Sequence, residues 1–82
     1  MDFEPGMLVR SKAGRDKGRV YVVVRAGADG IYLADGDKRP LSRMKKKNSR
    51  HLQPILKERL DDLSGDEPIR EICRRVENYV KS

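Results

Sequence analysis

Residues 14–34 read GRDKGRVYVVVRAGADGIYLA, and this stretch decides the fold class. Residues 19–25 are rich in β-branched side chains, which favour strands. A polar turn bounded by two glycines precedes them. The loop at 26–30 (AGADG) then supplies two glycines for a hairpin into a third strand at 31–34. The stretch therefore predicts antiparallel strands joined by tight turns.

More short strands are expected on both sides of this stretch. Residues 7–11 follow a Pro-Gly turn signal and form a first strand, and the Asp-Gly pair at 35–36 marks another tight turn. A fourth strand is expected at 38–41, where Pro40 places it at a sheet edge, and a fifth at 51–53. Five short strands in about 50 residues predict a small β-barrel.

The strand at 19–25 has two different faces. Val20, Val22 and Val24 point one way, and Tyr21 points the other way. The three valines are expected to face the core. Tyr21 is then either exposed or a half-buried tyrosine of the barrel.

The C-terminal part has a helical pattern. Pro54 suits a first helical turn, and three leucines follow at spacings of four and three. A second helix is expected to begin near Asp66 or Glu67, with Pro68 in its first turn. Its residues form one apolar stripe: Ile69, Ile72, Cys73, Val76, Tyr79 and Val80. The prediction is a two-helix hairpin that buries its apolar faces internally, against the barrel or against a second chain.

The charge is distributed unevenly along the chain. The 82 residues carry a formal charge of +6. Residues 1–53 hold 13 basic and 6 acidic side chains (+7), and residues 54–82 hold 6 and 7 (−1). The predicted organisation is therefore a basic module at 1–53 and a C-terminal extension at 54–82. A basic module indicates contact with nucleic acid or simply a basic soluble protein.

Length and composition exclude several classes of protein. A chain of 82 residues is too short for a large enzyme with a deep cleft, and no nucleophile–base pair stands out. The apolar run at residues 20–24 has five residues, far fewer than the roughly 20 of a membrane span. One histidine and one cysteine do not make a zinc site, so no metal or cofactor is expected. The absence of an export signal and the single cysteine favour a cytoplasmic protein.

Two basic segments are the candidate binding sites. The turn of residues 14–19 places three cations between and beside two glycines, and Asp16 is expected to hold the loop by accepting hydrogen bonds from its backbone. The run at 43–51 (RMKKKNSRH) has five cations in its first eight residues, which suits a phosphate-tracking loop. A solvated loop and a targeting signal are the other interpretations of the run.

These segments also carry a family resemblance. Gly6, Val9 and the sequence at 14–18 (GRDKG) before a valine-rich strand resemble the KOW motif of ribosomal proteins and NusG-like transcription factors. The continuation at 34–36 (ADG), Arg39, Leu41, 45–48 (KKKN) and 51–52 (HL) is similar to the small stand-alone bacterial KOW-domain proteins. That branch is similar to the fourteen-e-type proteins of the large ribosomal subunit. Tyr21 stands where the general motif has another glycine, and Met44 stands where the branch often has a proline before its lysine run.

The resemblance implies an SH3-like barrel that binds structured RNA, most simply ribosomal RNA, without catalysis. Tyr21 and Tyr32 are further candidates for stacking on bases. His51 either bonds RNA or has a structural role. The alternative function is a protein-interaction module in a transcription or translation assembly, with its helical tail docking a ribosomal or other protein or forming a homodimer. The expected RNA-binding residues are Gly14, Arg15, Asp16, Lys17, Gly18, Arg19, Arg39, Arg43, Lys45, Lys46, Lys47, Asn48, Arg50 and His51.

Overall fold

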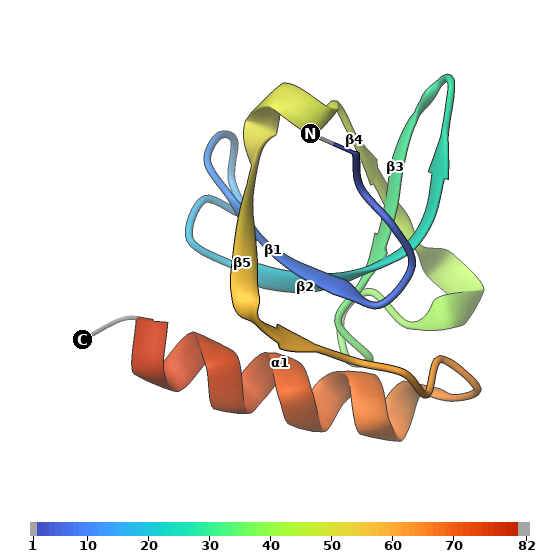
Figure 1. Cartoon of the computed structure of the whole chain (residues 1–82), viewed down its shortest axis with the longest axis vertical. Coiled ribbons are helices and arrows are strands. Elements are labelled where there is room, and N and C mark those ends of the chain that lie inside the picture. Colours follow the sequence, from blue (N-terminus) through green and yellow to red (C-terminus); the bar gives the residue numbers. More distant parts are fainter. Residues whose placement is uncertain (1, 81–82) are drawn as a thin grey trace.

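The chain forms a curved antiparallel sheet with one C-terminal helix against its outer face (Figure 1). This is a computed structural model that describes residues 2–80, and side chains as far as residue 78. The strand order is β4-β3-β2-β1-β5, and every neighbouring pair is antiparallel. The elements are β1 (Met7–Ser11), β2 (Val20–Gly27), β3 (Gly30–Ala34), the 3₁₀ helix η1 (Leu41–Arg43), β4 (Lys45–Lys47), the 3₁₀ helix η2 (Ser49–His51), β5 (Leu52–Arg59) and α1 (Asp66–Val80).

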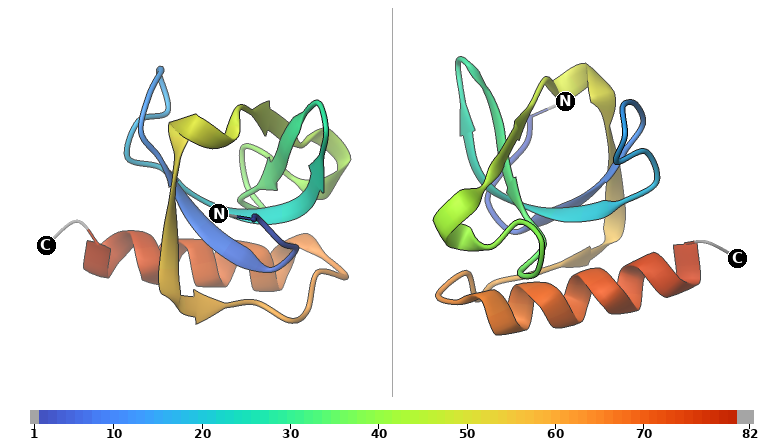
Figure 2. Two further views of the ribbon diagram at one scale, coloured as in Figure 1. Left: turned by 45° about the horizontal axis from the view of Figure 1, so that its top comes forward. Right: turned by 180° about the vertical axis from the view of Figure 1, so that it is seen from behind.

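The first three strands form where the sequence predicts them. The hairpin between β2 and β3 is tighter than the expected loop, because β2 continues to Gly27 and pairs there with Gly30. The pairing register shifts between Val23 and Arg25. Such a bulge increases the local twist of a strand and helps a sheet to curve. Figure 2 shows this curvature from two further directions.

Both faces of β2 are buried, which corrects the expectation of one valine face. The inner core lies inside the curve of the sheet, and the outer core lies between the sheet and α1. The inner core contains Val9, Tyr21, Val23, Ile31, Leu33 and Leu52. The outer core contains Leu8, Val20, Val22, Ala34, Ile69, Ile72, Cys73 and Val76. Tyr21 is therefore only 3% exposed, because a curved sheet with a helix outside it has no free face at its centre.

The expected fourth strand at 38–41 is wrong. Residues 35–39 form a tight turn, in which the Asp35 carboxylate accepts the backbone N–H groups of Asp37 and Arg39, both at 2.9 Å. Gly36 has a φ of +76°, as the predicted Asp-Gly turn requires. Pro40 precedes η1, and the fourth strand is instead the lysine run β4.

The first predicted tail helix is also wrong, because residues 52–59 form strand β5. The expected boundary between Gln53 and Pro54 falls inside this strand, which pairs with β1. Pro54 is tolerated because β5 lies at the edge of the sheet. Leu60 and Leu63 do reach the outer core, but from an extended segment rather than from a helix. The described residues thus contain one α-helix, not a helical hairpin.

Helix α1 matches the second predicted helix. Its apolar stripe from Ile69 to Val76 packs against β1 and β2, which is one of the three expected arrangements. Tyr79 and Val80 lie outside the described side chains. A partner that docked on the stripe would have to displace the helix. Burial also raises the pKa of the Cys73 thiol to about 12, so this cysteine is a packing residue.

Ile69→Ala tests whether α1 is part of the fold rather than an appendage. Ile69 is fully buried, so the truncation is expected to lower the free energy of unfolding by about 2–5 kcal/mol. Urea denaturation gives this quantity. The exposed Glu71 of the same helix provides the control, since Glu71→Ala is expected to change it by less than about 0.5 kcal/mol. Equal effects of the two substitutions would show that the helix is not docked.

No helix in the described part of the chain is long and apolar enough to cross a membrane.

Candidate functional site

The loop between β1 and β2 is organised by a buried carboxylate. Asp16 is only 8% exposed. Its Oδ1 accepts hydrogen bonds from Ser11 Oγ at 2.9 Å and Lys47 Nζ at 3.0 Å, and its Oδ2 accepts one from Tyr21 Oη at 2.8 Å. Lys45 Nζ lies 3.4 Å from Oδ2. Asp16 does hold the loop, but through four side chains from β1, β2 and β4 rather than through backbone N–H groups.

The hydrogen bonds decide the charge of this carboxyl group. Burial alone raises the pKa of Asp16, but the hydrogen bonds from Lys47, Tyr21 and Ser11 outweigh it and hold the pKa well below its usual range. Burial and the same hydrogen bond raise the pKa of Tyr21. Asp16 is therefore ionised and Tyr21 is neutral at ordinary pH.

The lysine run does not form a continuous line of exposed charge. Side chains alternate along a strand, so Lys45 and Lys47 turn towards Asp16 while Lys46 turns away. Lys47 is 10% exposed, and its Nζ also donates to Ala13 O at 3.0 Å. Lys46 Nζ lies 3.7 Å from Asp29 Oδ2, at the β2–β3 hairpin. The expected basic loop is thus an edge strand, two of whose charges stabilise the first loop.

A basic cleft of about 190 Å³ lies between the first loop, the 35–39 turn and β4. Tyr21, Asp16 and Asp35 form part of its wall. Its cations are Arg15, Arg19, Lys38, Arg39 and Lys45. Among the described residues, the side chains of the first four make no ion pair, whereas Lys45 is paired with Asp16. Five cations around two carboxylates leave a surplus of positive charge, which favours a polyanion.

Four of these cations belong to the binding set expected from the sequence, whereas Lys38 does not. The sequence does contain a signal that could have identified Lys38. This residue lies two positions after Gly36, in the predicted Asp-Gly turn, and the turn borders the cleft. Tyr21 forms part of the wall of the cleft, but its ring is largely buried. The cleft therefore joins residues that lie up to 30 positions apart along the chain.

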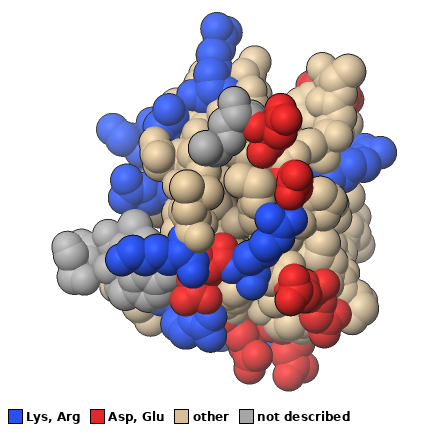
Figure 3. All heavy atoms as spheres, in the orientation of Figure 1, with Lys and Arg blue, Asp and Glu red and all other residues tan. Residues whose placement is uncertain are grey.

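Other expected binding residues lie outside the cleft. Lys17 and Gly18 border a second basic depression with Arg10 and Lys12. Arg43 is exposed, and Asn48 caps η2 by accepting the Arg50 N–H at 3.1 Å. Arg50 and His51 are exposed, and the carbonyl of His51 accepts the Lys12 N–H at 2.8 Å. Figure 3 shows basic side chains gathered at the upper left, on the side of the β1–β2 loop, while most acidic ones lie lower.

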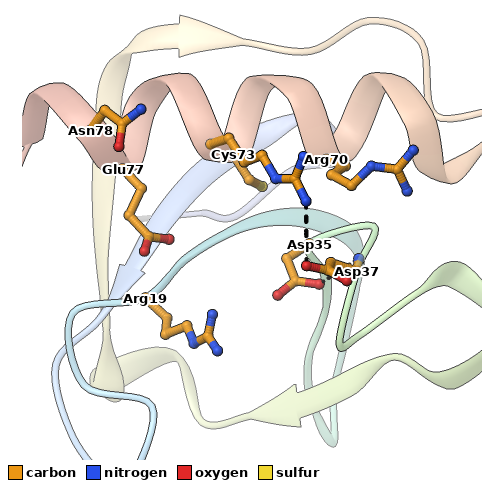
Figure 4. Close-up of a pocket in the computed structure, with 8 residues that line it drawn as sticks. Arg19, Asp35, Asp37, Arg70, Cys73, Glu77 and Asn78 are labelled. Atoms are coloured by element: carbon orange, nitrogen blue, oxygen red, sulfur yellow. Dashed lines mark hydrogen bonds and ion pairs between the residues drawn. The ribbon is translucent and has the colours of Figure 1, made fainter.

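A second cleft, of about 200 Å³, lies between α1 and the sheet (Figure 4). Arg19 and Asp35 face it from the sheet side, and Cys73, Glu77 and Asn78 face it from the helix. Its charges balance, because its lining contains three arginines and three carboxylates: Arg19, Arg70, Arg74, Asp35, Asp37 and Glu77. Arg74 pairs with Asp37 at 3.6 Å, and Arg70 donates to the Gly36 carbonyl at 2.9 Å. These polar contacts at the cleft hold α1 against the 35–39 turn.

The glycines of the first loop set its shape. Gly14 and Gly18 have φ values of +87° and +92°, a region that residues with a Cβ rarely adopt. A Cβ on Gly14 would meet Asp16 and Lys47 only at ordinary contact distance, 3.5 and 3.6 Å. The requirement for glycine there therefore comes from the backbone rather than from crowding.

Gly14→Ala is expected to lower the free energy of unfolding by about 1–2 kcal/mol through backbone strain. Thermal or urea denaturation measures the change. Gly65→Ala is the matched control, because Gly65 has no positive φ and open space around it. That control is expected to be neutral or slightly stabilising. A loss at Gly65 as large as that at Gly14 would contradict the account of the loop.

No family model matches the chain, and no curated protein matches it. Groups of three or more histidine, cysteine, aspartate or glutamate side chains that could hold a metal ion are absent from the described residues.

Proposed function

We propose that the chain is a non-enzymatic, cytoplasmic RNA-binding protein of the KOW type, with an SH3-like barrel that associates with ribosomal RNA. The basic cleft carries this proposal. Its unpaired arginines and lysine come from two loops that are each fixed by a carboxylate, Asp16 in one and Asp35 in the other. Arginine and lysine side chains held in this way suit phosphate groups of a folded RNA backbone.

The fold supports the proposal in two respects. The five antiparallel strands curve around an inner core, and the long β1–β2 loop projects beside β5 (Figure 1). The net charge also remains with the strands when the chain is divided at the start of α1. Residues 1–65 hold 15 basic and 9 acidic side chains (+6), and residues 66–82 hold four of each.

The cleft favours recognition of backbone and shape over sequence. The tyrosine in its wall is buried, and its hydroxyl is already bonded to Asp16. It therefore has little free ring surface for stacking on an unpaired base. We expect a structured RNA that presents several phosphates within the span of the cleft and the neighbouring Lys17.

The salt dependence of binding tests the proposal. If Arg15, Arg19, Lys38 and Arg39 neutralise four phosphates, log K against log[salt] is expected to have a slope near −3.6, at about 0.9 per phosphate. Filter binding or fluorescence anisotropy with a ribosomal RNA fragment measures this slope between about 50 and 300 mM salt. A flat dependence, or no binding at low salt, would overturn the proposal.

A further inference from the structure

A shallow apolar groove of about 330 Å³ lies where η2 meets β5. Leu52, Pro54 and Leu56, which alternate along β5, line it together with the polar Gln53, and Phe3 lines it from the N-terminal segment. Leu52 and Phe3 are anchored in the inner core, which gives the groove a fixed floor. Its volume is at the small end of ligand sites, enough for one or two side chains.

Leu56 is the exceptional residue of this groove. It is 74% exposed, whereas the other large hydrophobic side chains in the described part of the chain are at least partly buried. The pairing of β5 with β1 jumps from Ile55 to Arg59, so residues 56–58 lie in an irregular part of the strand. The irregularity presents Leu56 to solvent beside the groove.

The charges at the rim have one sign. Lys12 and Arg50 line the groove, and none of its lining residues is acidic. Both side chains are exposed and make no ion pair among the described residues. An occupant therefore needs an apolar part that covers Leu56 and carboxylates that meet the two cations.

We propose that this groove binds an extended acidic peptide segment of a partner protein, with one apolar side chain seated between Phe3 and Leu56 and flanking Asp or Glu residues at Lys12 and Arg50. β5 suits an extended occupant, because it is an edge strand bonded to β1 on one side only. The proposal does not rest on RNA binding, since none of the cations of the basic cleft lines the groove, and Arg50, an expected RNA-binding residue, lies outside that cleft.

The chemistry of the groove favours a peptide over a nucleic acid. Three of its apolar residues are aliphatic, and its aromatic ring, Phe3, is half-buried against the inner core. A single-stranded base stacks on an aromatic or guanidinium face, and among the lining residues only Arg50 at the rim offers an exposed face of this kind. An aliphatic wall with an exposed leucine instead suits a leucine or phenylalanine side chain of a peptide.

Selection from a displayed library of random peptides against the whole protein tests the proposal. Enriched peptides are expected to carry an apolar residue next to Asp or Glu. Synthetic versions are expected to bind Leu56→Asp at least tenfold more weakly than the unsubstituted protein. Arg50→Glu is expected to weaken binding in the same way.

Leu56 is exposed, so Leu56→Asp leaves both cores intact, which thermal denaturation checks. Lys57→Asp, on the same strand but outside the groove, is the matched control and is expected to keep binding within twofold.

Several outcomes would overturn the proposal. They are the enrichment of no peptide, the enrichment of peptides without acidic residues, and equal binding by the protein and its Leu56→Asp variant. NMR shifts of Phe3 and Leu56 on addition of RNA, with none on addition of acidic peptides, would assign the groove to nucleic acid. A homodimer that Leu56→Asp abolishes in sedimentation experiments would assign it to a second copy of the chain.

Discussion

Reversing the charges of Arg15, Lys38 and Arg39 together is expected to lower the affinity for structured RNA by about 1000-fold or more, since hydrogen bonds to charged groups contribute roughly 1.5–3 kcal/mol each and about 1.4 kcal/mol is a factor of ten. The three side chains line the basic cleft, and none makes an ion pair among the described residues. The salt slope is also expected to become shallower by about 3, or about 1 for each lost phosphate contact. Fluorescence anisotropy across a salt series measures both quantities.

A second triple reversal controls for the change in net charge. Lys57, Arg59 and Arg75 lie outside the basic cleft, and their substitution by glutamate changes the charge by the same amount. The ion pairs of Arg59 with Glu4 and of Arg75 with Glu58 involve arginine side chains more than half exposed, so their loss is expected to cost little stability. Equal losses of RNA affinity in the two triple variants would show that only the overall charge matters.

Asp16→Asn is expected to lower the free energy of unfolding by about 3 kcal/mol, because the substitution leaves the largely buried Lys47 ammonium without its counter-charge. It also weakens the hydrogen bonds from Ser11 and Tyr21 that join the first loop to the sheet. Urea denaturation at pH 7 measures the loss. Asp61→Asn, at an exposed position, is the control and is expected to be close to neutral. A neutral Asp16→Asn would contradict the role given to this carboxylate.

The pH dependence gives an independent measurement of the same carboxylate. Its pKa is lowered in the folded protein, so its stabilising effect is fully present above the ordinary value near 3.9 and is lost as the pH falls towards the folded pKa. The Asp16→Asn variant lacks this titration. The stability difference between the two proteins is therefore expected to shrink below about pH 4. A difference that stays constant from pH 7 to pH 2 would contradict this explanation.

The strands around the first hairpin were predictable because their signals are local. Glycines at the turns and β-branched residues between them define β1, β2 and β3 without reference to the rest of the chain. The segment 54–63 failed for the opposite reason. Its leucines have helical spacing, but Leu56 is exposed and the neighbouring Ile55 pairs with Leu8. The tertiary partner β1 decides that this segment is a strand.

The candidate site was predictable in composition but not in arrangement. Arg15, Arg19 and Arg39 lie in the basic cleft as cations of the expected set. The role of the lysine run depends on Asp16, which is about 30 residues away and becomes its neighbour only when β4 joins the sheet edge. Similarly, Tyr21 is buried because the sheet curves around it. Both facts follow from contacts between distant segments, which residue spacing does not encode.

An NMR titration of the isotope-labelled protein with a folded ribosomal RNA fragment tests the central claim most directly, because it shows where the RNA lies on the protein. If RNA lies in the basic cleft, amide shifts are expected to concentrate in the 14–19 loop, in the 35–39 turn and on β4, and the exposed face of α1 is expected to stay unchanged. Shifts confined to α1, or no shifts at saturating RNA and low salt, would contradict that claim.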